Sequence, residues 1–83
     1  MTRVDVYRKV LSILSDQLSI SVDMIKEESL LAGDLGADSL DTAEIAMMIK
    51  DEFGYDISDQ ELPQLKTVQD LVDLLSRSLT SSQ

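Results

Sequence analysis

The 83-residue sequence contains no cysteine and no histidine, and each absence removes a class of chemistry. Without cysteine there is no disulfide, no thiolate nucleophile and no Cys-type zinc site. Without histidine the chain lacks the commonest metal ligand and the usual general base near neutral pH. No apolar run approaches the roughly 20 residues of a membrane span, and the N-terminal MTRVDVYRKV lacks the apolar core of a signal peptide. We therefore expect a cytoplasmic protein that does not insert into membranes.

Basic residues are also scarce. The chain has 7 bases against 16 acids, which gives a formal net charge of −9. Nucleic-acid binding depends on cationic side chains against phosphates, so this balance argues against it. The same balance argues against an anionic membrane surface. Acidity of this degree favours soluble partners with basic patches, although it can also serve solubility alone.

The length implies a single domain over residues 1–83, with a polar tail at about residues 78–83. Aromatic residues make up only 4% of the chain, so the core must consist mainly of leucine, isoleucine, valine and methionine. These residue types suit helices, although isoleucine and valine do not exclude strands.

Four helix starts share one pattern, in which an oxygen-bearing cap precedes an acid by three residues. They are Thr2 with Asp5, Asp38 with Asp41, Ser58 with Glu61, and Thr67 with Asp70. Apolar residues at helical spacing follow three of them, over residues 4–18, 42–53 and 68–79. Pro63 limits the segment after Ser58 to about one turn, and Gly54 can end the second long helix. The long connection over residues 19–37 carries several apolar side chains and is expected to pack, with a turn of helix at 23–27. The sequence thus predicts an irregular four-helix bundle with three longer helices, one short one and a long packed loop between the first two.

The stretch DLGADSLDTAEI, residues 34–45, places Ser39 among four carboxylates at the expected start of a helix. Nucleophilic catalysis by Ser39 would need a base, but the chain has no histidine and no lysine or arginine in residues 27–49. Asp34, Asp38 and Asp41 do not have the spacing of a calcium-binding loop, so no dedicated metal site is expected. The remaining interpretations are a simple helix start or an attachment point for a group added by another enzyme.

Residues 27–61 hold eleven of the sixteen acids and a single base, Lys50. Such a run commonly forms a solvated face. It can also form a docking face for basic partners.

The run DLGADSLDT closely resembles the attachment motif of acyl carrier proteins of the dissociated, bacterial type II fatty-acid synthesis type. The resemblance spans nearly the whole chain and includes the connector EFGYDIS and the segment TVQDLVDLL. It implies a non-enzymatic, monomeric carrier in which Ser39 bears 4′-phosphopantetheine through a phosphodiester. A phosphopantetheinyl transferase (holo-carrier synthase) would add this group, and its thiol would hold growing fatty acyl chains as thioesters. Partners would be that transferase, together with fatty-acid synthesis enzymes and acyltransferases that carry basic docking patches.

The resemblance also implies roles for two sets of side chains. The docking surface would comprise Asp38, Leu40, Asp41, Glu44, Met47, Asp51 and Glu52. The cavity for the acyl chain would be bordered by Ile45, Ile49, Ile57, Leu62, Leu65, Leu71 and Leu75. The ordinary interpretation of the second set is a hydrophobic core, and most of these residues must serve that purpose in any case.

The chain departs from the family pattern in four places. Ser58 stands where a proline is usual, and Lys50 stands where an acid is usual. Pro63 is unusual within the short helix. The segment SLLAGDLG, residues 29–36, lacks the usual aromatic and acid and is one residue longer. Two alternative functions fit the same sequence: a specialised carrier for polyketide, lipopeptide or lipid A precursors, and an unmodified acidic helical adaptor for basic partner proteins.

Overall fold

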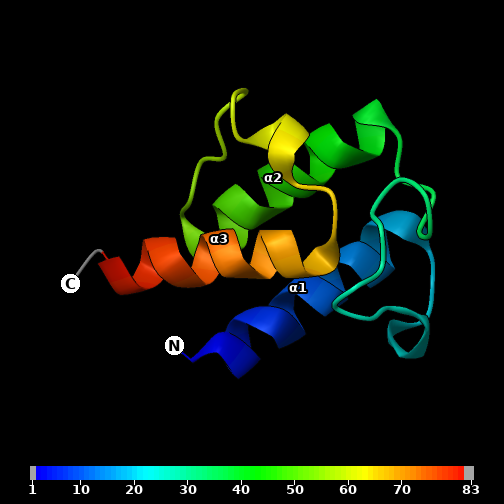
Figure 1. Cartoon of the computed structure of the whole chain (residues 1–83), viewed down its shortest axis with the longest axis horizontal. Helices are drawn as coiled ribbons and strands as arrows, with labels where there is room; N and C mark the ends of the chain where they lie inside the picture. Colours follow the sequence, from blue (N-terminus) through cyan, green and yellow to red (C-terminus); the bar gives the residue numbers. More distant parts are fainter. Residues whose placement is uncertain (1, 82–83) are drawn as a thin grey trace.

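The computed structural model describes the backbone of residues 2–81 and the side chains of residues 2–78. Its three α-helices are α1 (Arg3–Leu18), α2 (Ser39–Phe53) and α3 (Val68–Ser81), joined through the short 3-10 helices η1 (Val22–Met24) and η2 (Leu62–Gln64). Helix α1 contacts both other helices, and the connection between α1 and α2 occupies one end of the molecule (Figure 1). The predicted all-α bundle is confirmed. Helix α3 continues into the predicted polar tail as far as Ser81, and the last two residues lie outside the described part of the chain.

The four predicted helix caps are all present as hydrogen bonds. At α2, the N–H of Asp41 donates to Asp38 Oδ1 at 2.9 Å and the N–H of Asp38 donates to Asp41 Oδ2 at 3.3 Å. Thr2 and Asp5 form the same reciprocal pair at α1. Because each cap needs only residues three apart, the sequence pattern alone is sufficient to place the helix starts.

The segment after Ser58 begins as a helix but does not continue as one. The N–H of Glu61 donates to Ser58 Oγ at 3.2 Å, and the N–H of Leu62 donates to the carbonyl of Ser58 at 3.1 Å. The chain then tightens into η2, which contains Pro63. Proline has no N–H to donate and its ring crowds the preceding turn, so the predicted short helix is one turn followed by a 3-10 helix.

The connection between α1 and α2 packs against the protein, as predicted. Ile25, Leu31 and Ala37 are buried and belong to the core. Its single turn of helix is η1, which lies at residues 22–24, slightly before the predicted position. The backbone is also bound to the start of α3: Leu31 N–H donates to the carbonyl of Lys66 at 2.9 Å, and Val68 N–H to that of Ser29 at 3.1 Å. These two bonds form an isolated antiparallel bridge between Leu30 and Thr67, which holds the longer segment of residues 29–36 in place.

The core is aliphatic and draws on all three helices. Its most deeply buried side chains are Leu14, Ile49, Leu71, Leu75, Val6, Val10, Val68 and Val72. The few aromatic side chains lie at its edge, where Tyr7, Phe53 and Tyr55 pack against it while remaining partly exposed. A core without aromatic residues at its centre matches the expectation from composition.

Asp70 makes the stability of the start of α3 depend on pH. Its carboxylate accepts hydrogen bonds from the N–H groups of Thr67 and Lys66, each at 3.1 Å. These bonds lower the pKa of Asp70 below the ordinary 3.8, and the bond from Thr67 has the largest effect. A carboxyl whose pKa is lowered by folding stabilises the protein above its unfolded pKa of about 3.9, and this contribution is lost as the pH falls through the folded value. We expect Asp70→Asn to lower the free energy of unfolding by about 1 kcal/mol at pH 7, the usual size of a cap.

Urea unfolding of the wild type and of Asp70→Asn at pH 7 and pH 3 measures this effect. The difference between the two proteins should shrink at pH 3. Asp59→Asn, a change at an exposed acid, is the control and should leave stability nearly unchanged. Equal destabilisation by Asp70→Asn at both pH values would show that the charged form of Asp70 does not stabilise the helix start.

Candidate functional site

Ser39 is the first residue of α2, and its side chain is exposed. Two local features of the backbone place this side chain at the surface. Gly36 adopts a left-handed φ of 74°, which turns the chain before the helix, and buried Ala37 donates its N–H to the carbonyl of Leu31 at 2.9 Å. Asp38 then caps the helix in an extended conformation. The hydroxyl of Ser39 is thus held at the rim of a fixed turn, where another molecule can reach it.

An open groove of about 530 Å³ lies beside Ser39, and most of its lining is apolar. Three segments build it: residues 30–33 of the connection, Ala37 with the first turn of α2, and residues 59–66 around η2. The two charged residues that line it are Asp59 and Lys66. Two departures from the family pattern, the segment of residues 29–36 and Pro63, therefore shape the wall next to the candidate attachment point.

A small enclosed cavity of about 10 Å³ adjoins this groove, with room for roughly one water molecule. Groove and cavity share Leu31, Ala37, Thr42, Leu62 and Leu65 as lining residues. The cavity is completed by Ile45, Ala46, Ile57 and Leu71. An apolar route therefore leads from Ser39 towards the core, but in this conformation the inner space is nearly closed.

The structure places five of the seven predicted cavity residues around this enclosed space: Ile45, Ile57, Leu62, Leu65 and Leu71. Ile49 and Leu75 do not line it and are fully buried core residues. Sequence reasoning missed Leu31, Ala37, Thr42 and Ala46. The position of Ala37 and Thr42 next to Ser39 was a signal for those two, whereas nothing in the sequence pointed to Leu31.

The predicted docking residues share α2 and its cap. Leu40, Glu44, Met47 and Asp51 are spaced by four, three and four residues, which places them on one face of the helix. Leu40 is 74% and Met47 69% exposed, which is high for apolar side chains. Asp38, Glu44, Asp51 and Glu52 are exposed, and Asp41 is half-buried. This surface presents two apolar side chains among carboxylates.

Side chains of α1 contact several of these acids. Gln17 Nε2 donates to Glu44 Oε2 at 2.7 Å and to Asp41 Oδ1 at 3.3 Å. Lys9 Nζ lies 3.4 Å from Glu52 Oε2, an exposed ion pair that contributes little to stability. The predicted docking surface is therefore bordered by α1 along one side.

Among the described residues, no three acids are grouped so that they could hold a metal ion. Within the same part of the chain, none of the helices has the length and apolar character needed to cross a membrane.

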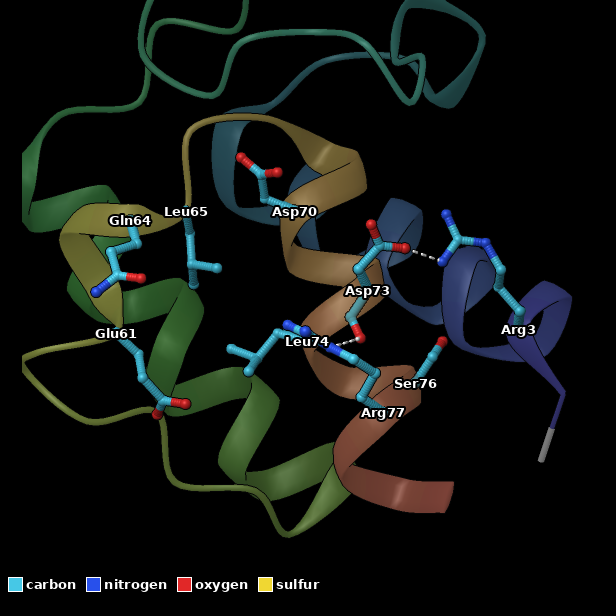
Figure 2. Close-up of a pocket in the computed structure, with 9 residues that line it drawn as sticks. All are labelled: Arg3, Glu61, Gln64, Leu65, Asp70, Asp73, Leu74, Ser76 and Arg77. Atoms are coloured by element: carbon cyan, nitrogen blue, oxygen red, sulfur yellow. Dashed lines mark hydrogen bonds and ion pairs between the residues drawn. The ribbon is translucent and has the colours of Figure 1, made fainter. Parts of the chain in front are cut away.

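A second depression, of about 510 Å³, runs along α3 and shares the lining residue Leu65 with the groove beside Ser39 (Figure 2). Arg3 lies on one side of α3 in this view, and Glu61 and Gln64 lie on the other. Arg3 forms ion pairs with Asp73 and, at 2.8 Å, with Glu27. These contacts join α1, the connection and α3, and Ser39 does not line this depression.

Comparison with known proteins identifies the family. The phosphopantetheine attachment site family model matches residues 8–75. An acyl carrier protein of Thermosynechococcus vestitus is 40% identical over 81 residues, which cover 98% of this chain and 100% of the relative. One from Coprothermobacter proteolyticus is 37% identical over 79 residues, covering 95% and 96%. The solved structure of the acyl carrier protein from Enterococcus faecalis is similar, with a TM-score of 0.78 and 35% identity over 93% of this chain and 98% of that one.

The chain therefore belongs to the acyl carrier protein family and contains the phosphopantetheine attachment domain. It is a carrier and not an enzyme, and its cofactor is phosphopantetheine. The residues around Ser39 fit such a group. An exposed hydroxyl is available for the ester, and the adjoining groove is open enough to accommodate a flexible arm.

Proposed function

We propose that this protein carries growing fatty acyl chains on a phosphopantetheine arm esterified to Ser39, and presents them to fatty-acid synthesis enzymes in the cytoplasm as a monomer. One observation carries the assignment of the site. The exposed residue Ser39 lines an apolar groove that adjoins an enclosed cavity. An acyl chain on an arm attached to Ser39 can therefore lie along this groove.

The cofactor and the side chains around Ser39 have separate roles. When bound, the cofactor supplies the thiol that the sequence lacks and holds acyl groups as thioesters. Asp38 and Asp41 lie beside the attachment point, and their negative charge keeps the phosphodiester in solvent. Leu31, Leu62 and Leu65 separate the open groove from the inner cavity and offer apolar surface to the cargo. These aliphatic side chains can part without leaving polar groups unpaired.

The partners are a phosphopantetheinyl transferase and then fatty-acid synthesis enzymes and acyltransferases with basic patches. Supporting this proposal are the net charge of −9 and the exposed acids of α2, which steer oppositely charged surfaces into contact. Exposed Leu40 and Met47 add a small apolar contact. Charge steering with a small apolar contact allows rapid exchange among many partners.

The cargo distinguishes this function from the alternatives. We expect the intact mass of protein purified from its own cell to exceed the chain mass by one phosphopantetheine, with further species that carry fatty acyl groups. Intermediates of polyketide, lipopeptide or lipid A synthesis at the same position would instead assign a specialised carrier. An unmodified chain throughout would support the acidic adaptor and overturn the proposal.

A further inference from the structure

Gln17 lies in the last turn of α1 and reaches across to the docking surface on α2. Its side-chain amide donates to Glu44 Oε2 at 2.7 Å and to Asp41 Oδ1 at 3.3 Å. The shorter bond has the length of a strong hydrogen bond to a charged acceptor. A single amide nitrogen thus joins two of the acids that surround the candidate attachment point.

Asp41 and Glu44 are three residues apart, on one side of the same helix, where two like charges repel each other. The two hydrogen bonds from Gln17 hold one oxygen of each carboxylate within about 6 Å of the other. Because glutamine is neutral, it positions both carboxylates and leaves their charge uncancelled. Glu52 differs from these two acids, because the α1 side chain beside it is the cation Lys9, 3.4 Å away, which partly cancels its charge.

The two carboxylates keep capacity for a further donor. Among the described residues, Glu44 Oε1 receives no hydrogen bond, and a carboxylate offers about four lone-pair positions. Leu40 and Met47, which are largely exposed, lie on the same helix as these acids. An arginine guanidinium is planar, has five donors and suits paired carboxylate oxygens better than a lysine ammonium does.

We propose that Gln17 is a positioning residue of the docking surface, whose neutral amide holds Asp41 and Glu44 together as one site for an arginine of a partner enzyme. This inference rests on the proposed carrier function. It assigns to α1 a part in partner recognition that the sequence motif around Ser39 does not contain. The docking surface then has two parts. Asp41 and Glu44, near Ser39, keep their full charge, whereas Lys9 partly neutralises Glu52 in the other part.

The test is steady-state kinetics of a promiscuous phosphopantetheinyl transferase, with coenzyme A in excess and the carrier as the varied substrate. We expect Gln17→Ala to raise KM about three- to tenfold with kcat unchanged, the usual range for the loss of one ordinary hydrogen bond. Gln17→Lys keeps a donor but cancels one charge, so its KM should rise as well. Gln69→Ala, a change at an exposed glutamine of α3, is the matched control and should behave as the wild type.

A double-mutant cycle separates positioning from a general structural effect. In a Glu44→Ala background, Gln17→Ala should raise KM by a clearly smaller factor than in the wild type, because the main acceptor is already absent. Circular dichroism at the assay temperature confirms that each variant is folded. An unchanged KM for Gln17→Ala, an equal rise in both backgrounds, or a wild-type KM for Gln17→Lys would each overturn the inference. A wild type that gains no mass would overturn the proposed function and this inference together.

Discussion

Replacing Ser39 by alanine is expected to abolish covalent modification completely. Wild-type protein incubated with coenzyme A and an active phosphopantetheinyl transferase should gain the mass of one phosphopantetheine, and Ser39→Ala should gain none. The change removes only an exposed hydroxyl from the first residue of α2, and alanine is the most favourable residue in a helix. We therefore expect the variant to fold, so that loss of mass gain reports the attachment site and not the structure.

A serine outside the motif supplies the matched control. Ser12 is exposed on α1, and Ser12→Ala should be modified at the wild-type rate. Far-ultraviolet circular dichroism of both variants should match the wild type. Modification of Ser39→Ala by a transferase that also modifies the wild type would assign the tether to another residue.

The features predicted most accurately from the sequence are those that depend on near neighbours. Each helix cap joins residues three apart, so the pair Asp38 and Asp41 predicts the start of α2 from the local sequence alone. Pro63 likewise limits its own segment, because its ring and its missing N–H act on adjacent turns. The position of Ser39 at an exposed helix start follows from the same local rules.

The features that escaped prediction depend on contacts between distant segments. The bond from Leu31 to Lys66 builds one wall of the groove, and nothing in either sequence segment identifies the other as its partner. Gln17 lies 27 residues before Glu44, and a glutamine near the end of a helix has no pattern that marks it as part of a site. Periodicity showed that Ile49 faces inward, but it could not show whether that side chain borders a cavity or the solid core.

Truncation of Leu71 should have the second large effect, and it should depend on the cargo. Leu71 is 1% exposed and lines the enclosed cavity beside the groove. Leu71→Ala removes buried apolar volume and enlarges the cavity, so we expect the free energy of unfolding without cargo to fall by about 2–5 kcal/mol. When an octanoyl chain is attached through the arm, it can occupy the new space, and the loss should be smaller.

Urea unfolding of four proteins tests this expectation: wild type and Leu71→Ala, each with an unacylated arm and with an octanoylated arm. Leu14→Ala is the control, because Leu14 is as deeply buried but does not line the cavity. Its destabilisation should be the same with and without the acyl chain. The dependence on cargo arises because the cavity has only about 10 Å³ in this conformation, so a chain must either part the aliphatic lining or find space that a mutation has opened. An equal loss for Leu71→Ala in both states would place the acyl chain outside this cavity, along the open groove.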